Sequence, residues 1–203
     1  MNVYVETNFV LELAFQQEQY ASCEEILNLC TKGLSRLTIP AYCLAEPHEK
    51  LKRQSTSRKE LQRVLEVELG QLARTASYTT QTAHIQQDIA RLLIQSTEEE
   101  KQRFNRYRDR LLQLAEVIPL THEILKTASR YESAYDLTSQ DALVYASVKS
   151  HLEQYKPEQS CFLNRNTRDF DTPDIVDDLS SHGCKMIPRF DDGCELIRSQ
   201  ASQ

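Results

Sequence analysis

Four acidic residues stand where a carboxylate could take part in chemistry. They are Glu6, Glu46, Asp141 and Asp169. Glu6 ends a short apolar run over residues 3–5, and the other three lie near expected strand ends or helix starts. Carboxylate oxygens are the ligands that hard divalent cations such as Mg²⁺ and Mn²⁺ prefer. The four residues therefore predict a metal site, provided that the fold brings them together.

Short apolar runs alternate with helical patterns in both outer parts of the chain, and this alternation predicts how the acids are positioned. The expected strands are residues 2–6, 34–39, 116–119, 160–164 and 184–187. The expected helices are residues 8–17, 20–32, 40–54, 121–134 and 138–153. The pattern predicts an α/β fold with a central parallel sheet and helices on both faces. The carboxyl ends of parallel strands meet at one crevice, where distant acids can converge.

The middle of the chain, at about residues 57–115, departs from this alternation. Apolar residues recur there at helical spacing, and 97–100 has the Ser/Thr-x-x-Glu form of a capping box that restarts a helix. We expect an antiparallel helical hairpin inserted into the fold. Its apolar stripe is most simply the seam of the hairpin, and a homodimer interface or an antitoxin-like partner is the alternative.

Composition favours one soluble domain over residues 1–203. The mean hydropathy of −0.55 and the absence of an apolar run approaching ~20 residues argue against a membrane span. The start MNVYVET lacks the basic region and long apolar core of a signal peptide. We therefore expect a cytoplasmic protein.

The net charge of −6 is unusual for a protein that binds nucleic acid, because phosphate affinity comes largely from Lys and Arg. The basic residues are nevertheless grouped in two stretches: Lys50, Lys52, Arg53, Arg58, Lys59 and Arg63, then Arg103, Arg106, Arg108 and Arg110. RNA contacts and solvated helix faces explain such stretches equally well.

Other common site chemistries lack their sequence patterns. The six cysteines form no Cys-x-x-Cys pair, so reduced and mostly buried thiols are expected. The chain has no Gly-x-Ser-x-Gly turn, and its four glycines cannot form a dinucleotide loop or a P-loop.

Structural explanations compete with the chemical ones at two places. Thr7 and Asn8 are good helix starters, and capping the helix at 8–17 would explain both. Asp141 follows Thr138-Ser139-Gln140 and is favourably placed in a first helical turn. The capping and metal-binding roles of Asp141 are compatible.

The four acidic stations resemble the motifs of the PIN-domain ribonucleases, including toxins of the VapC kind. That family has an Asp-Thr/Ser-Asn/Ser sequence after the first strand, Ala-Glu on an early helix, Asp-Ala at the start of a late helix and a final Thr/Ser-Arg-Asp/Asn-x-x-Asp-Phe. The resemblance covers about residues 1–54 and 116–190. Two positions depart from it: Glu6 replaces the usual Asp, and Asn166 stands where many members carry the fourth carboxylate.

The resemblance implies a three-layer α/β/α fold and a metal-dependent endoribonuclease. Mg²⁺ or Mn²⁺ would be held by Glu6, Glu46 and Asp141, with Asp169 or Asn166 completing the shell directly or through water. Asn8 would approach the scissile phosphate. RNA is the expected substrate, and a toxin role with an antitoxin partner is compatible with it. The alternative is a catalytically weak PIN-like module that binds RNA or a protein.

Overall fold

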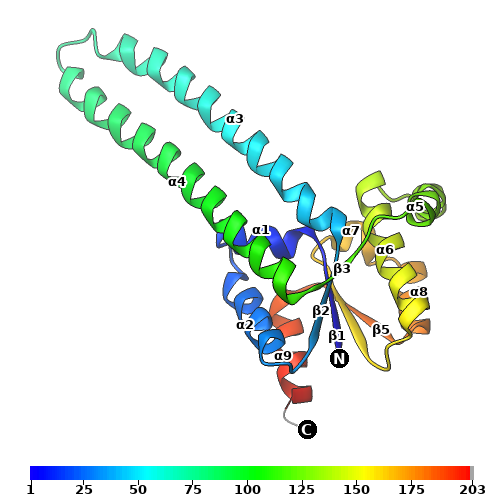
Figure 1. Ribbon diagram of the computed structural model, residues 1–203. Coiled ribbons are helices and arrows are strands. Elements are labelled where there is room, and N and C mark those ends of the chain that lie inside the picture. Colours follow the sequence, from blue (N-terminus) through cyan, green and yellow to red (C-terminus); the bar gives the residue numbers. More distant parts are fainter. Residues whose placement is uncertain (202–203) are drawn as a thin grey trace.

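The computed structural model describes residues 1–201, and its centre is a five-stranded, fully parallel sheet (Figure 1). The strand order is β3-β2-β1-β4-β5. The strands are β1 (Asn2–Val5), β2 (Arg36–Pro40), β3 (Glu116–Ile118), β4 (Ser160–Leu163) and β5 (Cys184–Ile187). The predicted α/β fold with a central parallel sheet is confirmed.

Strand β1 occupies the middle of the sheet and of the core. Val3 is in register with Leu37 of β2 on one side and with Cys161 of β4 on the other. All three residues are buried, as are Tyr4 and Val5. Such continuous burial is typical of parallel strands covered on both faces, and it explains why these runs are apolar without alternation.

Helices cover both faces of the sheet, as Figure 1 shows. On one face, α2 (Tyr20–Thr31) packs against α1 (Thr7–Phe15) and α9 (Phe190–Ala201). On the other face, α6 (Ser139–Tyr155) packs against α5 (His122–Tyr135), and its Tyr145 bonds to Asp178 of α8 (Pro173–Ser181). The short α7 (Thr167–Phe170) follows β4. The predicted three layers are therefore present.

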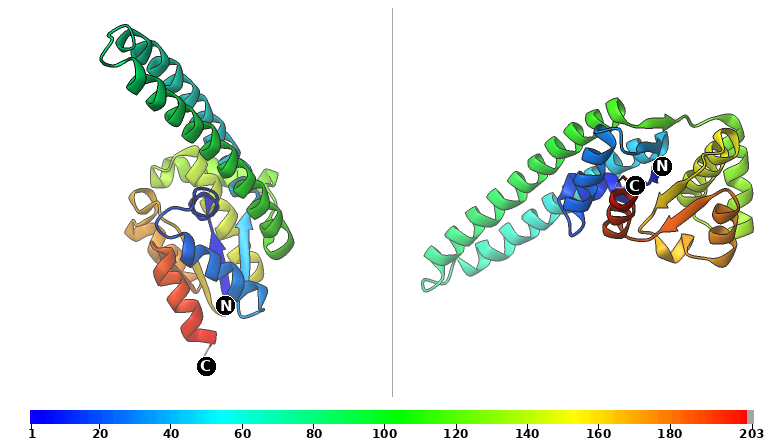
Figure 2. Two further views of the ribbon diagram at one scale, coloured as in Figure 1. Left: turned by 90° about the vertical axis from the view of Figure 1, so that its left-hand side faces the viewer. Right: turned by 90° about the horizontal axis from the view of Figure 1, so that it is seen from below.

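Two long antiparallel helices, α3 (Ala41–Leu72) and α4 (Thr79–Leu114), pack along each other and project from the sheet (Figures 1 and 2). The predicted helical hairpin is present, and residues 57–115, all of them described, contain no strand. Its first helix is the same helix that follows β2, because α3 runs unbroken past residue 54, where we expected an end.

The expected helix restart at residue 97 is wrong. Thr97 lies inside α4, and its hydroxyl donates to the Leu93 carbonyl at 2.8 Å instead of capping a new helix. Glu100 is buried and forms an ion pair with Arg58 of α3 at 2.7 Å. The Thr-x-x-Glu pattern therefore reflects an internal helical turn and a contact between the two hairpin helices.

The last turns of α4 belong to the body of the protein rather than to the projecting arm. Phe104, Tyr107 and Leu111 are buried in the main core. The Arg110 guanidinium also bonds to Glu24 of α2 at 2.6 Å. The hairpin is thus anchored by α4 on the α1/α2 face and by α3 at the end of β2.

The cysteines follow the expectation of reduced, buried thiols. All six are free and buried. Burial raises the pKa of the Cys30 thiol to about 11, so this thiol stays protonated at neutral pH. Of the helices within residues 1–201, none combines the length and apolar character needed to cross a membrane.

Candidate active site

A cavity of about 250 Å³ lies beyond the carboxyl ends of β1, β2 and β4. Five of the six predicted site residues line it: Glu6, Asn8, Glu46, Asp141 and Asn166. The sixth, Asp169, does not line the cavity but accepts a hydrogen bond from Asn166 at 2.7 Å. The parallel sheet therefore brings Asp141 to the same cavity as Glu6 and Glu46, although it follows both by more than 90 residues in the sequence.

Glu6 stands between β1 and α1 and is only 5 % exposed. Its Oε2 accepts the backbone N–H of Asn8 at 2.6 Å, so Glu6 itself caps α1 where we expected Thr7 or Asn8 to do so. Its Oε1 accepts the backbone N–H of Arg165 at 3.4 Å. Burial, with a smaller contribution from the nearby charge of Glu46, raises the pKa of Glu6 to about 7, although these two bonds lower it.

Glu46 lies early in α3, directly after β2, and is half-buried. The Thr7 hydroxyl, which the sequence suggested as a helix cap, donates to the Glu46 carboxylate. This bond joins the start of α1 to the start of α3. It orients Glu46 toward the cavity that Glu6 also lines.

Asp141 lies in the first turn of α6, and the capping explanation for it is correct. The Thr138 hydroxyl accepts the Asp141 N–H at 3.2 Å and donates to Asp141 Oδ2 at 2.6 Å. The other oxygen, Oδ1, accepts from the Asn166 amide at 3.1 Å. These bonds hold the carboxylate at the cavity wall, so capping is compatible with a position at the cavity.

The loop after β4 contributes two asparagines, of which sequence reasoning identified only Asn166. Asn164 is 1 % exposed, and its Oδ1 accepts the Asn166 N–H at 2.7 Å. Asn164 lines the cavity, and its Nδ2 is buried and has no hydrogen-bond partner among the described residues. A buried donor without a partner fits an oxygen ligand or water in the cavity. Its place just after a buried strand was the available signal.

Two cations on the cavity rim were also missed as site residues. Lys50 and Arg53 of α3 line the cavity and are exposed. Their spacing of four and seven residues from Glu46 puts them on the same helix face, which is a signal that the sequence does contain.

The donor set fits a divalent cation, although not through a complete shell of acids. Within residues 1–201, no group of three or more His, Cys, Asp or Glu side chains is arranged to hold one metal ion. Mg²⁺ needs only one or two carboxylates and completes its shell with water and substrate phosphate. Glu6 and Glu46 offer such a pair, since Glu6 is buried without a basic side-chain partner and Glu46 raises its pKa.

The sequence matches the family described as the PIN domain over residues 3–170, which is most of the chain. The chain therefore belongs to the PIN-domain family, whose members are generally nucleases.

One solved structure is similar over 92 % of this chain and 99 % of its own, with 11 % identity and a TM-score of 0.45. It is the crystal structure of VapBC2 from Rickettsia felis bound to a DNA fragment from their promoter. No curated protein matches the chain.

Proposed function

We propose that this chain is a metal-dependent endoribonuclease that hydrolyses phosphodiester bonds in RNA. The observation that carries the proposal is the meeting of Glu6, Glu46 and Asp141, from three separate parts of the chain, around one cavity. Membership of a family of nucleases supports the same reaction class. Mg²⁺ or Mn²⁺ is the proposed cofactor, because the polar walls offer oxygen ligands.

Each residue has a stated role in this proposal. Glu6 and Glu46 hold the cation as the carboxylate pair, and Asp141, together with Asn166 or Asp169, completes the shell directly or through water. Asn8 approaches the scissile phosphate. When bound, the cation supplies a water of lowered pKa and neutralises charge at the phosphate. The hydrogen bonds from Thr7 and Thr138 orient Glu46 and Asp141 before substrate arrives.

Asp141→Asn tests the proposal most directly. The substitution removes one negative charge, but the Thr138 hydroxyl can still accept the residue 141 N–H, so α6 keeps its cap. Cleavage of a labelled single-stranded RNA should fall by at least about 100-fold, because one ligand of a shared site is lost. The matched control is Glu123→Gln, an exposed acid in the first turn of α5, which should leave the rate unchanged.

Two results would end the metal-nuclease proposal. One is full activity in the Asp141→Asn variant. The other is equal cleavage by the wild-type chain in excess EDTA and in Mg²⁺ or Mn²⁺.

The second candidate function is a catalytically weak PIN-like module that binds RNA or a protein. It is favoured by Asn166, whose amide donates to both Asp141 and Asp169 where many family members have a fourth carboxylate. RNA binding without metal-dependent cleavage would support this candidate over the enzyme.

A toxin role, an antitoxin partner, a homodimer and a cytoplasmic location stay predictions. Co-purification with the product of a neighbouring gene, together with loss of cleavage in that complex, would support the toxin role.

A further inference from the structure

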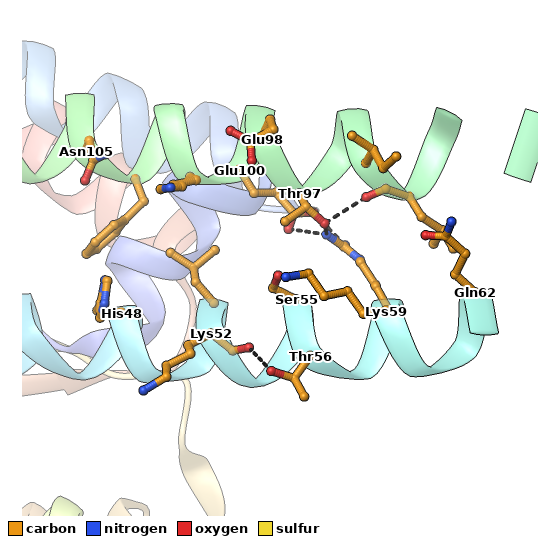
Figure 3. A pocket seen from close by; sticks show the side chains of 16 residues that line it. His48, Lys52, Ser55, Thr56, Lys59, Gln62, Thr97, Glu98, Glu100 and Asn105 are labelled. Carbon is orange, nitrogen blue, oxygen red and sulfur yellow. Dashed lines mark hydrogen bonds and ion pairs between the residues drawn. The ribbon is translucent and has the colours of Figure 1, made fainter. Parts of the chain in front are cut away.

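The basic side chains of α3 fall on two opposite faces of the helix. Lys50 and Arg53 line the cavity with the acids. Lys52 and Lys59 line a different hollow of about 540 Å³ between α3 and α4, shown in Figure 3. All four side chains are exposed, so only their direction separates the two pairs.

Lys50 and Arg53 carry charges that the protein itself does not neutralise by contact. Within residues 1–201 neither forms an ion pair at 4.0 Å or less, whereas Arg58 and Arg63 of the same helix pair with Glu100 and Glu60. An unpaired cation beside a cavity remains available to an anionic ligand. This matters in a chain of net charge −6, because that overall charge disfavours the binding of phosphates.

The spacing along α3 fits the neighbouring phosphates of a nucleic-acid strand. Glu46, Lys50 and Arg53 share one helix face, and a rise of about 1.5 Å per residue puts Arg53 about 10 Å beyond Glu46 along the axis. An extended strand with one phosphate at the acids would bring the next phosphates beside these cations. The Arg53 guanidinium can hold a phosphate in bidentate fashion, and the Lys50 ammonium acts as a point charge.

We propose that Lys50 and Arg53 bind the phosphates that flank the cleaved phosphodiester of a single-stranded RNA. The proposal rests on the proposed function and adds to it a path for the substrate, from the cavity outward along α3. Its ligand chemistry is the sugar-phosphate backbone, so binding through these residues should not depend on base sequence.

A binding experiment with matched charge changes tests this path. The probe is a fluorescein-labelled, unstructured single-stranded RNA, titrated with the full-length chain and followed by anisotropy at 50–200 mM KCl. All proteins carry Asp141→Asn, so cleavage does not interfere. The Lys50→Gln/Arg53→Gln pair is compared with the Lys52→Gln/Lys59→Gln pair, which removes the same charge from the opposite face of the same helix.

We expect the cavity-face pair to bind RNA about tenfold more weakly and to lose about 1.4 from the slope of log affinity against log salt, at about 0.7 per phosphate contact. The opposite-face pair should stay within about twofold of the parent in affinity. Equal weakening by both pairs would mean general attraction to charge, and unchanged affinity in the cavity-face pair would mean no contact. Either result overturns the proposal.

Failure of this path and failure of the proposed function give different results. If the wild-type chain cleaves RNA in a metal- and Asp141-dependent way but the cavity-face pair retains full affinity, only the phosphate path is wrong. If no cleavage occurs while the two pairs differ in affinity as expected, the path stands and hydrolysis is wrong.

Discussion

Glu6 is the residue at which stability and function oppose each other. Its carboxyl group is buried, and its hydrogen bonds come from two backbone N–H groups rather than from a basic side chain. Burial raises its pKa from 4.5 to about 7, so the folded chain binds a proton more tightly than the unfolded chain does. A charged Glu6 therefore costs folding free energy, which a bound cation would offset.

We predict that Glu6→Gln stabilises the metal-free protein at pH 8. The unfolded chain loses the Glu6 proton near pH 4.5, whereas the folded chain keeps it until about pH 7. The stability that Glu6 contributes is therefore complete below pH 4.5 and is lost as the pH rises through 7. By urea unfolding, the variant should exceed the wild type by up to about 3 kcal/mol at pH 8, and by little at pH 4.5.

Mn²⁺ supplies the companion measurement for Glu6. Saturating Mn²⁺ at pH 8 should raise the melting temperature of the wild type by more than that of Glu6→Gln, because a neutral amide is a weaker ligand for the cation than a carboxylate. The exposed Glu123→Gln variant should behave as the wild type throughout. A Glu6→Gln variant that is less stable at every pH would show that Glu6 is needed for its backbone bonds and not retained for its charge.

Among the elements, the buried strands could be predicted from local patterns in the sequence. The runs at 2–6 and 160–164 are predictable because parallel strands covered on both faces are largely apolar. The place of the acids was also predictable, because the carboxyl ends of parallel strands lie along one edge of the sheet. Asn164 directly follows strand β4 and so carried the same positional signal as Glu6, which directly follows β1.

Contacts between elements could not be predicted from local pattern. The bond from Thr7 to Glu46 joins two helix starts 39 residues apart, and the Asn166 amide reaches Asp141 from another loop. The sequence pattern assigned Glu100 to a helix cap, because nothing in the local sequence indicates its partner Arg58, which lies 42 residues away on α3. In each case a local role would explain the side chain, but in the folded chain it contacts a residue on a distant element.

The ion pair between Arg58 and Glu100 leads to a testable prediction about the contact between α3 and α4. It is bidentate, at 2.7 and 2.8 Å, and ties α3 to α4 beside the Thr97 hydroxyl. Glu100→Gln should lower the free energy of unfolding by about 2 kcal/mol, because it leaves a partly buried guanidinium without its anion. Hydrogen exchange should rise mainly in the amides of α3 and α4.

The control for this pair lies on the same hairpin. Glu60→Gln breaks the exposed ion pair with Arg63 and should cost less than about 0.5 kcal/mol. If the two substitutions lower the free energy of unfolding by the same amount, burial of the Arg58–Glu100 pair does not add to its contribution to stability.

At the scale of the whole molecule, the hairpin has two parts with different neighbours. Its base is core: Phe104, Tyr107 and Leu111 of α4 are buried against the body. Farther out, α3 and α4 contact mainly each other, as the projecting arm in Figure 2 shows. Much of the apolar stripe there is exposed rather than sealed in the seam, with Leu61, Leu72, Ile85 and Leu92 between 39 and 66 % exposed.

This division determines how much of the hairpin can be deleted without preventing the chain from folding. Removing residues 57–115 entirely would take Phe104, Tyr107 and Leu111 out of the core, and the chain should not fold. Removing only 66–92, with Leu65 joined to Leu93 by a short glycine-rich turn, keeps the core residues, the Arg58–Glu100 pair and the face of α3 that carries Lys50 and Arg53.

We predict that the chain lacking 66–92 folds cooperatively and retains Asp141-dependent cleavage of single-stranded RNA within about threefold of the full chain. The reason is that every residue of the cavity, including both cations on its rim, lies outside residues 66–92. Circular dichroism during urea unfolding and the cleavage rate measure the two parts separately.

The further deletion of 57–115 is the negative control and should give no cooperative transition. Loss of folding in the 66–92 deletion would mean that the outer arm supports the sheet. A folded but inactive protein would mean that the outer arm contributes to the substrate or to an assembly the reaction requires.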